Sequence, residues 1–193
     1  MTKKADTAKD SPKNGAAAAK ADAPPPLNDA EVAEKIAKLR SQVRESFGKV
    51  VMAMMTQPRY RHQTLSDLQH LVLEPLTVDR IAMAYSKDGQ NAGDMAGMAI
   101  WASVSEEVDL KIRDQVKAGT FPIRLKPNEW QSGKINWLLD VIAVDQQTAG
   151  KVIANFQQVI KDGELRLHPI ITRLVDEDTL KRIQQHQKTE ADG

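Results

Sequence analysis

Cysteine is absent from this chain of 193 residues, and so are long apolar runs. Without cysteine the chain has no disulfide bond, no thiolate metal ligand and no cysteine nucleophile. No stretch approaches the ~20 apolar residues that span a bilayer, and the N-terminus lacks the apolar segment of a secretory signal. We therefore expect a protein without a membrane span that stays in the cytoplasm, where it is made.

An excess of charge of either sign is missing as well. The 27 basic and 26 acidic side chains nearly cancel, and only 4% of the residues are aromatic. Nucleic-acid-binding proteins usually show a basic excess, or a basic stripe with interleaved aromatic residues. The composition therefore argues against a nucleic-acid partner. The hydrophobic share of 41% suffices for a normal core over ~150 residues.

Residues 1–28 offer almost nothing apolar to bury. Lys, Ala, Asp and Pro dominate them, with three consecutive prolines at 24–26. Such a composition is typical of a disordered tail. A basic anchoring arm is the alternative, but three aspartates dilute its charge, which favours a plain solvated tail. One folded domain is expected over residues 29–188.

Helical periodicity begins near Asp29, an expected N-cap residue. Apolar residues then recur at steps of four, three and four, as on one face of a helix: Val32, Ile36, Leu39 and Val43. The stripe continues until Pro58, and it fits packing on the domain better than a short coiled coil. Further helices are expected over 65–72, halted by Pro75, and over 105–119, 148–160 and 175–187.

The period changes to that of strands in four other segments. Residues 81–85 and 97–102 flank a loop rich in Gly, Asp and Asn, which predicts a hairpin. Residues 136–144 are mostly apolar, as in a strand buried on both faces, and residues 165–171 form a further strand. Strand, helix and strand after a hairpin predict a single α/β (α+β) domain with a mixed central sheet flanked by helices.

Asp140 interrupts the apolar run of the predicted central strand. A buried carboxylate costs several kcal/mol unless it is paired or hydrogen-bonded. It is therefore either part of a structural ion pair or a catalytic carboxylate, and the physical argument leaves both open.

The four histidines, at 62, 70, 168 and 186, form no HExxH motif and have no acidic neighbour at metal-ligand spacing. No metal site is expected. His62 differs from the others because it follows Pro58-Arg59-Tyr60-Arg61, just past the end of a helix. Taken alone, a loop histidine beside arginines is more often a surface residue than a catalytic one.

Gln147, Gly150 and Lys151 lie between the central strand and the next helix. Backbone N–H groups at a helix N-terminus bind phosphate, and a lysine there adds charge. GNAT-superfamily acetyltransferases carry a Gln/Arg-x-x-Gly-x-Gly/Ala loop at this place, but Val152 stands where its last small residue should be. An ordinary helix start is the alternative.

Three motifs resemble the lysine acyltransferases that activate RTX protoxins, over residues 51–171. The most specific is Trp130-Gln131-Ser132-Gly133, followed by Trp137 and then Asp140-Val141-Ile142-Ala143, at the spacing of that family. The second is Trp101-Ala102-Ser103-Val104-Ser105. The third matches the family's Ser-Pro-x-His element with Gln57-Pro58-Arg59-Tyr60-Arg61-His62, in which the serine is missing and two extra residues precede the histidine.

The resemblance implies a GNAT-like fold and a catalytic pair formed by His62 and Asp140 in one cleft. It also implies a fatty acyl donor carried by acyl carrier protein as a phosphopantetheine thioester, with no bound cofactor, and an acceptor that is an internal lysine of an RTX-type protoxin. Arg59, Arg61, Gln147, Gly150 and Lys151 are expected to bind the donor. A homodimer is left open, and the alternative function is that of a non-catalytic adaptor.

Overall fold

The computed structural model describes residues 28–86, 94–158, 160, 165–176 and 180–181. The tail predicted for residues 1–28 lies outside these ranges apart from Asn28, and so does most of the helix predicted for 175–187. Within the described ranges, no helix is both long and apolar enough to cross a membrane.

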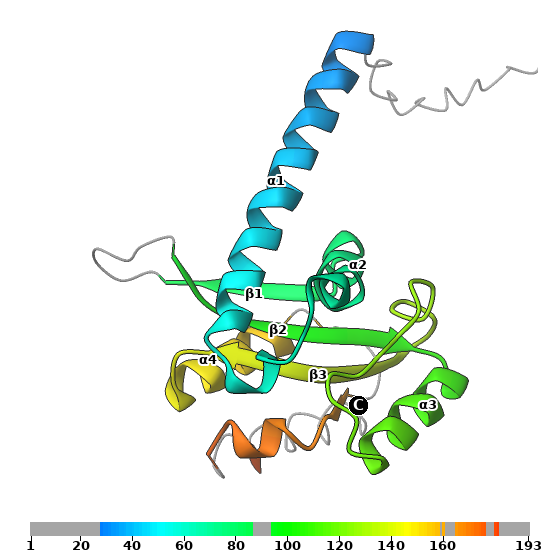
Figure 1. The fold of residues 1–193 in the computed structure, drawn as a ribbon, viewed down its shortest axis with the longest axis vertical. Helices are drawn as coiled ribbons and strands as arrows, with labels where there is room; N and C mark the ends of the chain where they lie inside the picture. The colour runs from blue at the N-terminus through cyan, green and yellow to red at the C-terminus, as the bar shows by residue number, and fades with distance from the viewer. Residues whose placement is uncertain (1–27, 87–93, 159, 161–164, 177–179, 182–193) are drawn as a thin grey trace, which may run out of the picture.

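A four-stranded sheet forms the centre of the fold (Figure 1). Strands β1 (Ile81–Tyr85), β2 (Met95–Val104), β3 (Ile135–Ala143) and β4 (Leu165–Leu167) lie side by side in chain order. The pairs β1–β2 and β2–β3 are antiparallel, whereas β3–β4 is parallel. The predicted mixed sheet flanked by helices is confirmed. Strand β4 is shorter than expected, because Pro169 has no N–H to donate and the chain turns into a short 3-10 helix, Ile171–Arg173.

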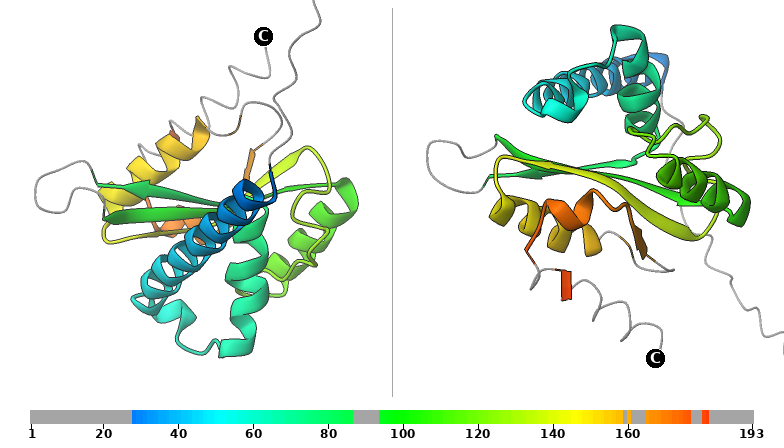
Figure 2. Two further views of the ribbon diagram at one scale, coloured as in Figure 1. Left: turned by 90° about the horizontal axis from the view of Figure 1, so that it is seen from above. Right: turned by 60° about the horizontal axis from the view of Figure 1, so that its bottom comes forward.

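Helix α1 (Asp29–Met55) is long, and its C-terminal half packs on one face of the sheet (Figures 1 and 2). Its N-cap is Asn28 rather than the predicted Asp29. The Asn28 side chain accepts a hydrogen bond from the Glu31 N–H at 2.8 Å, and the Glu31 carboxylate accepts one from the Asn28 N–H at 3.2 Å. These two bonds form a capping box, which fixes where the helix begins.

The segment after α1 departs from the predicted helix over 65–72. It contains a 3-10 helix (Leu65–Asp67), a π-helix (Gln69–Leu73) and α2 (Glu74–Thr77). Pro75 does not stop the helical segment. It lies in the first turn of α2, where the absence of a backbone N–H costs nothing.

The remaining helices begin and end close to the predicted positions. Helix α3 (Glu106–Lys117) follows the N-cap Ser105, and Gly119, with φ of 69°, ends it. Helix α4 (Gln146–Gln157) begins two residues earlier than predicted, because Asp145 caps it by accepting the Thr148 N–H at 2.7 Å. The view from below shows α4 on the face of the sheet opposite α1 and α2 (Figure 2).

A bulge in β3 decides which way Asp140 faces. Ile100 pairs with Asp140, but the next residue of β2, Trp101, pairs with Leu138. The extra residue, Leu139, packs in the apolar cluster on the α1 side. Because a bulge re-aims the side chains beside it, Asp140 also faces the chain that follows α1, as its hydrogen bonds show.

Candidate active site

The Asp140 carboxylate is 2% exposed and accepts four hydrogen bonds. Arg59 donates from Nε to Oδ2 at 3.1 Å and from Nη2 to Oδ1 at 3.2 Å. The Tyr60 hydroxyl donates to Oδ2 at 2.6 Å, and the backbone N–H of Val141 donates to Oδ1 at 2.8 Å. Asp140 is therefore part of an ion pair, as one of the two interpretations from the sequence expected. Because its partners come from a turn beside a pocket, the structure is also compatible with the other, a role in catalysis.

Arg59 ties this turn to the central strand. Besides Asp140, its guanidinium donates to the carbonyl oxygen of Val141 at 2.9 Å and to Gln57 Oε1 at 2.7 Å. The short 3-10 helix Pro58–Tyr60 is thus fixed against β3. The charge of Arg59 faces a buried carboxylate, so the guanidinium proposed to bind a donor is already occupied within the protein.

Burial and pairing act in opposite directions on these groups. Burial raises the pKa of Asp140 above its usual value, against the opposing effects of Arg59, Tyr60 and the Val141 N–H. Burial, together with the neighbouring carboxylate, raises the pKa of Tyr60 well above its usual value. The Tyr60 hydroxyl therefore keeps its proton and acts as a donor toward Asp140.

His62 lies two residues beyond this cluster, in an exposed turn. Its Nε2 accepts a hydrogen bond from Arg61 Nε at 3.0 Å. Within the described residues no hydrogen bond or ion pair joins His62 to Asp140. The structure thus brings together Asp140, Arg59 and Tyr60, and it places the predicted His62 next to them in sequence, at the surface.

Tyr60 was not singled out from the sequence, although a signal was present. The Ser-Pro-x-His element puts the histidine two residues after the proline, and in this chain that position is Tyr60. The contact to Asp140 is made from this position. The difference from the family element can therefore be described in a second way: tyrosine stands at the position where the element has histidine.

A pocket opens beside the Asp140 cluster. Its volume is about 20 Å³, enough for about one water molecule. Tyr60, Trp130 and Asp140 are its polar lining residues. The other lining side chains are apolar, among them Met54, Leu71, Ile100, Phe121 and Ile123. Trp130 Nε1 is buried and has no hydrogen-bond partner among the described residues. The pocket is therefore small and mostly apolar, and it contains an N–H donor that has no partner among the described residues.

The Trp130–Gly133 motif holds the loop before β3 against the end of β2. Ser132 Oγ accepts the Ser105 N–H at 2.9 Å, and Gly133 N–H donates to the Ser103 carbonyl at 3.1 Å. A Cβ on Gly133 would lie 2.5 Å from the Val104 carbonyl oxygen, so no larger residue fits there. The motif thus fixes Trp130 at the pocket.

The start of α4 is separated from the turn that carries Arg59 and Arg61 by the sheet (Figure 2). Gln147 and Lys151 are exposed, and Gly150 is half-buried. The Asp145 carboxylate accepts the Thr148 N–H, and this bond keeps the pKa of Asp145 below its usual value. A phosphate bound at this helix N-terminus would have to compete with the Asp145 carboxylate for the backbone N–H groups.

Asp109 is a second buried carboxylate, 5% exposed, at the other end of β3. It accepts the Trp137 Nε1–H at 2.8 Å and pairs with Arg113 Nε at 3.0 Å and with Arg166. Although burial raises its pKa, the bonds from Arg166 and Trp137 and the charge of Arg113 bring the pKa below the usual value. This cluster joins α3, β3 and β4.

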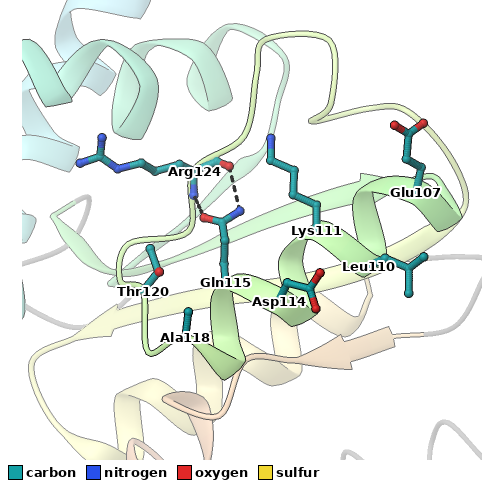
Figure 3. A pocket seen from close by; sticks show the side chains of 8 residues that line it. All are labelled: Glu107, Leu110, Lys111, Asp114, Gln115, Ala118, Thr120 and Arg124. Carbon is teal, nitrogen blue, oxygen red and sulfur yellow. Dashed lines mark hydrogen bonds between the residues drawn. The ribbon is translucent and has the colours of Figure 1, made fainter.

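A hollow between α3 and the loop that follows it is lined by several charged side chains (Figure 3). The Gln115 amide spans it, accepting the Arg124 N–H at 2.8 Å and donating to the Arg124 carbonyl at 3.1 Å. Its charged side chains are of both signs, among them Glu107, Lys111, Asp114 and Arg124. Among the described residues no three His, Asp or Glu side chains form a group that could hold a metal ion.

Comparison with known proteins identifies one family. The family model of the RTX toxin acyltransferases (HlyC) matches residues 39–185. The matched range includes the turn from Gln57 to His62, the pocket and Asp140. A comparison with curated protein sequences found no match.

Proposed function

Because this chain belongs to the RTX toxin acyltransferase family, it is an acyltransferase, and we propose that it transfers a fatty acyl group from acyl carrier protein to an internal lysine of an RTX-type protoxin. The family match, which spans the Asp140 cluster and its pocket, is the observation that carries this proposal. An adaptor that only binds a partner gives no account of that match.

Transfer to lysine requires a neutral amine. A free lysine has a pKa of ~10.4, so at neutral pH nearly all of it is ammonium and cannot attack a thioester. His62 is an exposed imidazole and can take that proton as a general base. The amine then attacks the thioester carbonyl carbon, the carbon–sulfur bond breaks, and the thiolate leaves with the proton that the imidazole returns. Because the chain has no cysteine, we propose direct transfer without a thioester on the enzyme.

Asp140 serves in this account as a positioning residue. Through Arg59 and Tyr60 it fixes the turn whose next residues are Arg61 and His62. A general base has to lie within hydrogen-bond reach of the proton that it removes, so a loosened turn would slow the reaction. In place of the direct hydrogen bond first expected between His62 and Asp140, we propose that Asp140 positions His62 indirectly, through the backbone of residues 59–62.

The lining of the pocket beside Tyr60 supports a fatty donor over a polar one. This lining is apolar except at the Asp140 cluster and at Trp130 Nε1. The pocket holds only about 20 Å³, so an acyl chain would enter it only as the apolar side chains around it move apart. The free Trp130 N–H could donate to the thioester carbonyl, where negative charge develops during attack.

Arg61, Lys151, Gln147 and Gly150 remain the residues proposed to contact the carrier-bound donor. Arg61 and Lys151 are exposed cations. Acyl carrier protein is acidic, so such cations would raise the association rate and make it depend on salt. Arg59 leaves this set, because its guanidinium binds Asp140. We further propose that the transfer depends on the carrier protein and takes place in the cytoplasm. The proposal holds for a monomer as well as for a homodimer.

The proposal is tested by incubating the purified chain with acylated carrier protein and a candidate RTX protoxin. The intact mass of the protoxin should rise by one acyl group for each modified lysine, and peptide mapping should locate amide-linked acyl groups on lysine. Tight binding of the protoxin without any change in mass would favour the adaptor and contradict the proposal. The same reaction with acyl-coenzyme A tests the donor, because equal use of both donors contradicts dependence on the carrier.

A further inference from the structure

The N-terminal half of α1, residues 29–42, extends beyond the rest of the domain (Figure 1). Every residue of this half is exposed, and helix packing begins with Val43 and Phe47 and becomes complete at Val50. The apolar stripe nevertheless continues outward. Val32 is 39% exposed, Ile36 43% and Leu39 60%. The face that packs on the domain thus runs on for several turns with nothing of the described chain covering it.

This exposed stripe has a hollow and a basic rim. Ile36, Leu39 and Val43 form the apolar floor of a shallow groove between side chains of this one helix, open to solvent, whose edge carries Arg40 and Arg44. Residues 35–44 contain four cations, Lys35, Lys38, Arg40 and Arg44, and no acidic residue. An apolar groove edged by cations complements a partner that presents apolar side chains flanked by carboxylates.

The chain itself supplies no suitable cover. Residues 1–27 contain, apart from Ala and Pro, only Met1 and Leu27 as apolar side chains, and residues 182–193 contain only Ile183 as a large one. A second copy is also opposed by charge, because two such grooves packed together would bring Arg40 and Arg44 of one helix against the cations of the other. The occupant is therefore an acidic partner.

We propose that the groove on the N-terminal half of α1 is the docking surface for the acidic acyl carrier protein. The identity of this partner rests on the proposed function. Helix α1 ends at Met55, two residues before the Pro58–Tyr60 turn that binds Asp140. A carrier protein on this helix therefore lies on the same face of the sheet as the Asp140 pocket, with its acyl arm directed along α1 toward it.

Two charge reversals on the same helix make a matched test. Arg40 lines the groove, whereas Lys38, two residues away, projects from the opposite side of the helix because successive residues are turned by a little over a quarter of a turn. Binding of acylated carrier protein to wild type, R40E, K38E and L39D is measured by calorimetry at low and high salt. We expect R40E and L39D to weaken binding about ten-fold, K38E to stay within about two-fold, and wild-type affinity to fall with salt.

Because these side chains are exposed, all three variants should melt at the wild-type temperature. Equal affinities for R40E and K38E would overturn the inference. The inference would also be overturned if R40E bound the carrier protein normally but lost self-association, binding to the protoxin, or binding to anionic phospholipid vesicles. A carrier-free donor, acyl-pantetheine, separates the two proposals. If R40E transfers from acyl-pantetheine at the wild-type rate and also binds the carrier protein normally, the docking site is wrong and the proposed function stands. If wild type transfers from no donor, the proposed function itself is contradicted.

Discussion

Two buried aspartates, Asp109 and Asp140, have similar hydrogen-bond partners but lie in different surroundings. Asp140 belongs to β3 and Asp109 bonds to it from α3, and each carboxylate is bonded to arginine and to an aromatic side chain. The partners of Asp109 come from α3, β3 and β4, and they bring its pKa below the usual value. Those of Asp140 come from a turn and leave its pKa above the usual value, since burial outweighs them.

The comparison shows that a paired, buried carboxylate does not by itself mark an active site. Asp109 joins regular elements to one another, and among the described residues it is not part of the lining of the apolar pocket beside Trp130. Asp140 borders this pocket and anchors the turn that carries His62. We therefore assign Asp109 to stability, and Asp140 to both stability and catalysis. The predictions that follow separate these assignments.

The largest effect on stability should come from removing either carboxylate. In D140N the partly buried guanidinium of Arg59 loses its charged partner. In D109N the partly buried Arg166 and the exposed Arg113 lose theirs. Breaking a buried pair on one side costs about 3–5 kcal/mol, so both variants should lose free energy of unfolding in this range in urea titrations. A loss below about 1 kcal/mol in either variant would show that its ion pair contributes little to folding.

Removing the proposed base should affect rate and leave stability unchanged. H62Q should lower the rate of protoxin acylation about 100-fold or more, the usual contribution of a general base. Its melting temperature should match that of wild type, because His62 is exposed. Single-turnover rates with acylated carrier protein provide the measurement, and S66A, at an exposed residue of the next turn, serves as the control. A rate within a few-fold of wild type would remove His62 from the mechanism.

The Tyr60 hydroxyl should matter less than either group. Y60F removes one hydrogen bond to a charged group, worth about 1.5–3 kcal/mol, and keeps the ring packed on Phe121. Acylation should slow about ten-fold, because the turn is less firmly held. If Y60F lost more activity than H62Q at equal folded fraction, Tyr60 with Asp140 would be the reacting pair, and His62 a surface residue.

The smallest effect concerns His168, which is buried next to β4. Burial lowers the pKa of His168 below its usual value of about 6.5. On acidification below that value the unfolded chain takes up a proton on this residue before the folded chain does, so the free energy of unfolding should fall as the pH decreases. H168Q should show a smaller decrease between pH 6.5 and 5 in the same urea titrations. Parallel curves for the two proteins would contradict the lowered pKa.

Most of the fold could be predicted from the sequence because it follows from periodicity and caps. The strands over 81–85 and 136–144, the N-cap at Ser105 and the stop at Gly119 all depend on local patterns. The path after Leu65 could not, because Pro75 is compatible with the first turn of a helix as well as with its end. Strand 165–171 was predicted too long for a similar reason, since its pairing with β3 ends before Pro169.

The site shows the same division. Asp140 stood out from the sequence because a carboxylate in an apolar strand needs a partner. The identity of that partner depends on a bulge at Leu139 and on a turn about 80 residues earlier, and neither leaves a periodic signal. Only the family resemblance pointed to His62, whereas the contact to Asp140 is made by Arg59 and Tyr60.

The assignment of Asp140 to catalysis and of Asp109 to stability is tested most directly by one experiment with matched variants. Wild type, D140N and D109N are incubated with acylated carrier protein and protoxin under conditions in which all three are folded, and acylated lysine is quantified by mass spectrometry. The account predicts transfer by wild type and, within about three-fold per folded molecule, by D109N, with transfer by D140N reduced about 100-fold. Transfer by D140N at the rate of D109N would contradict it.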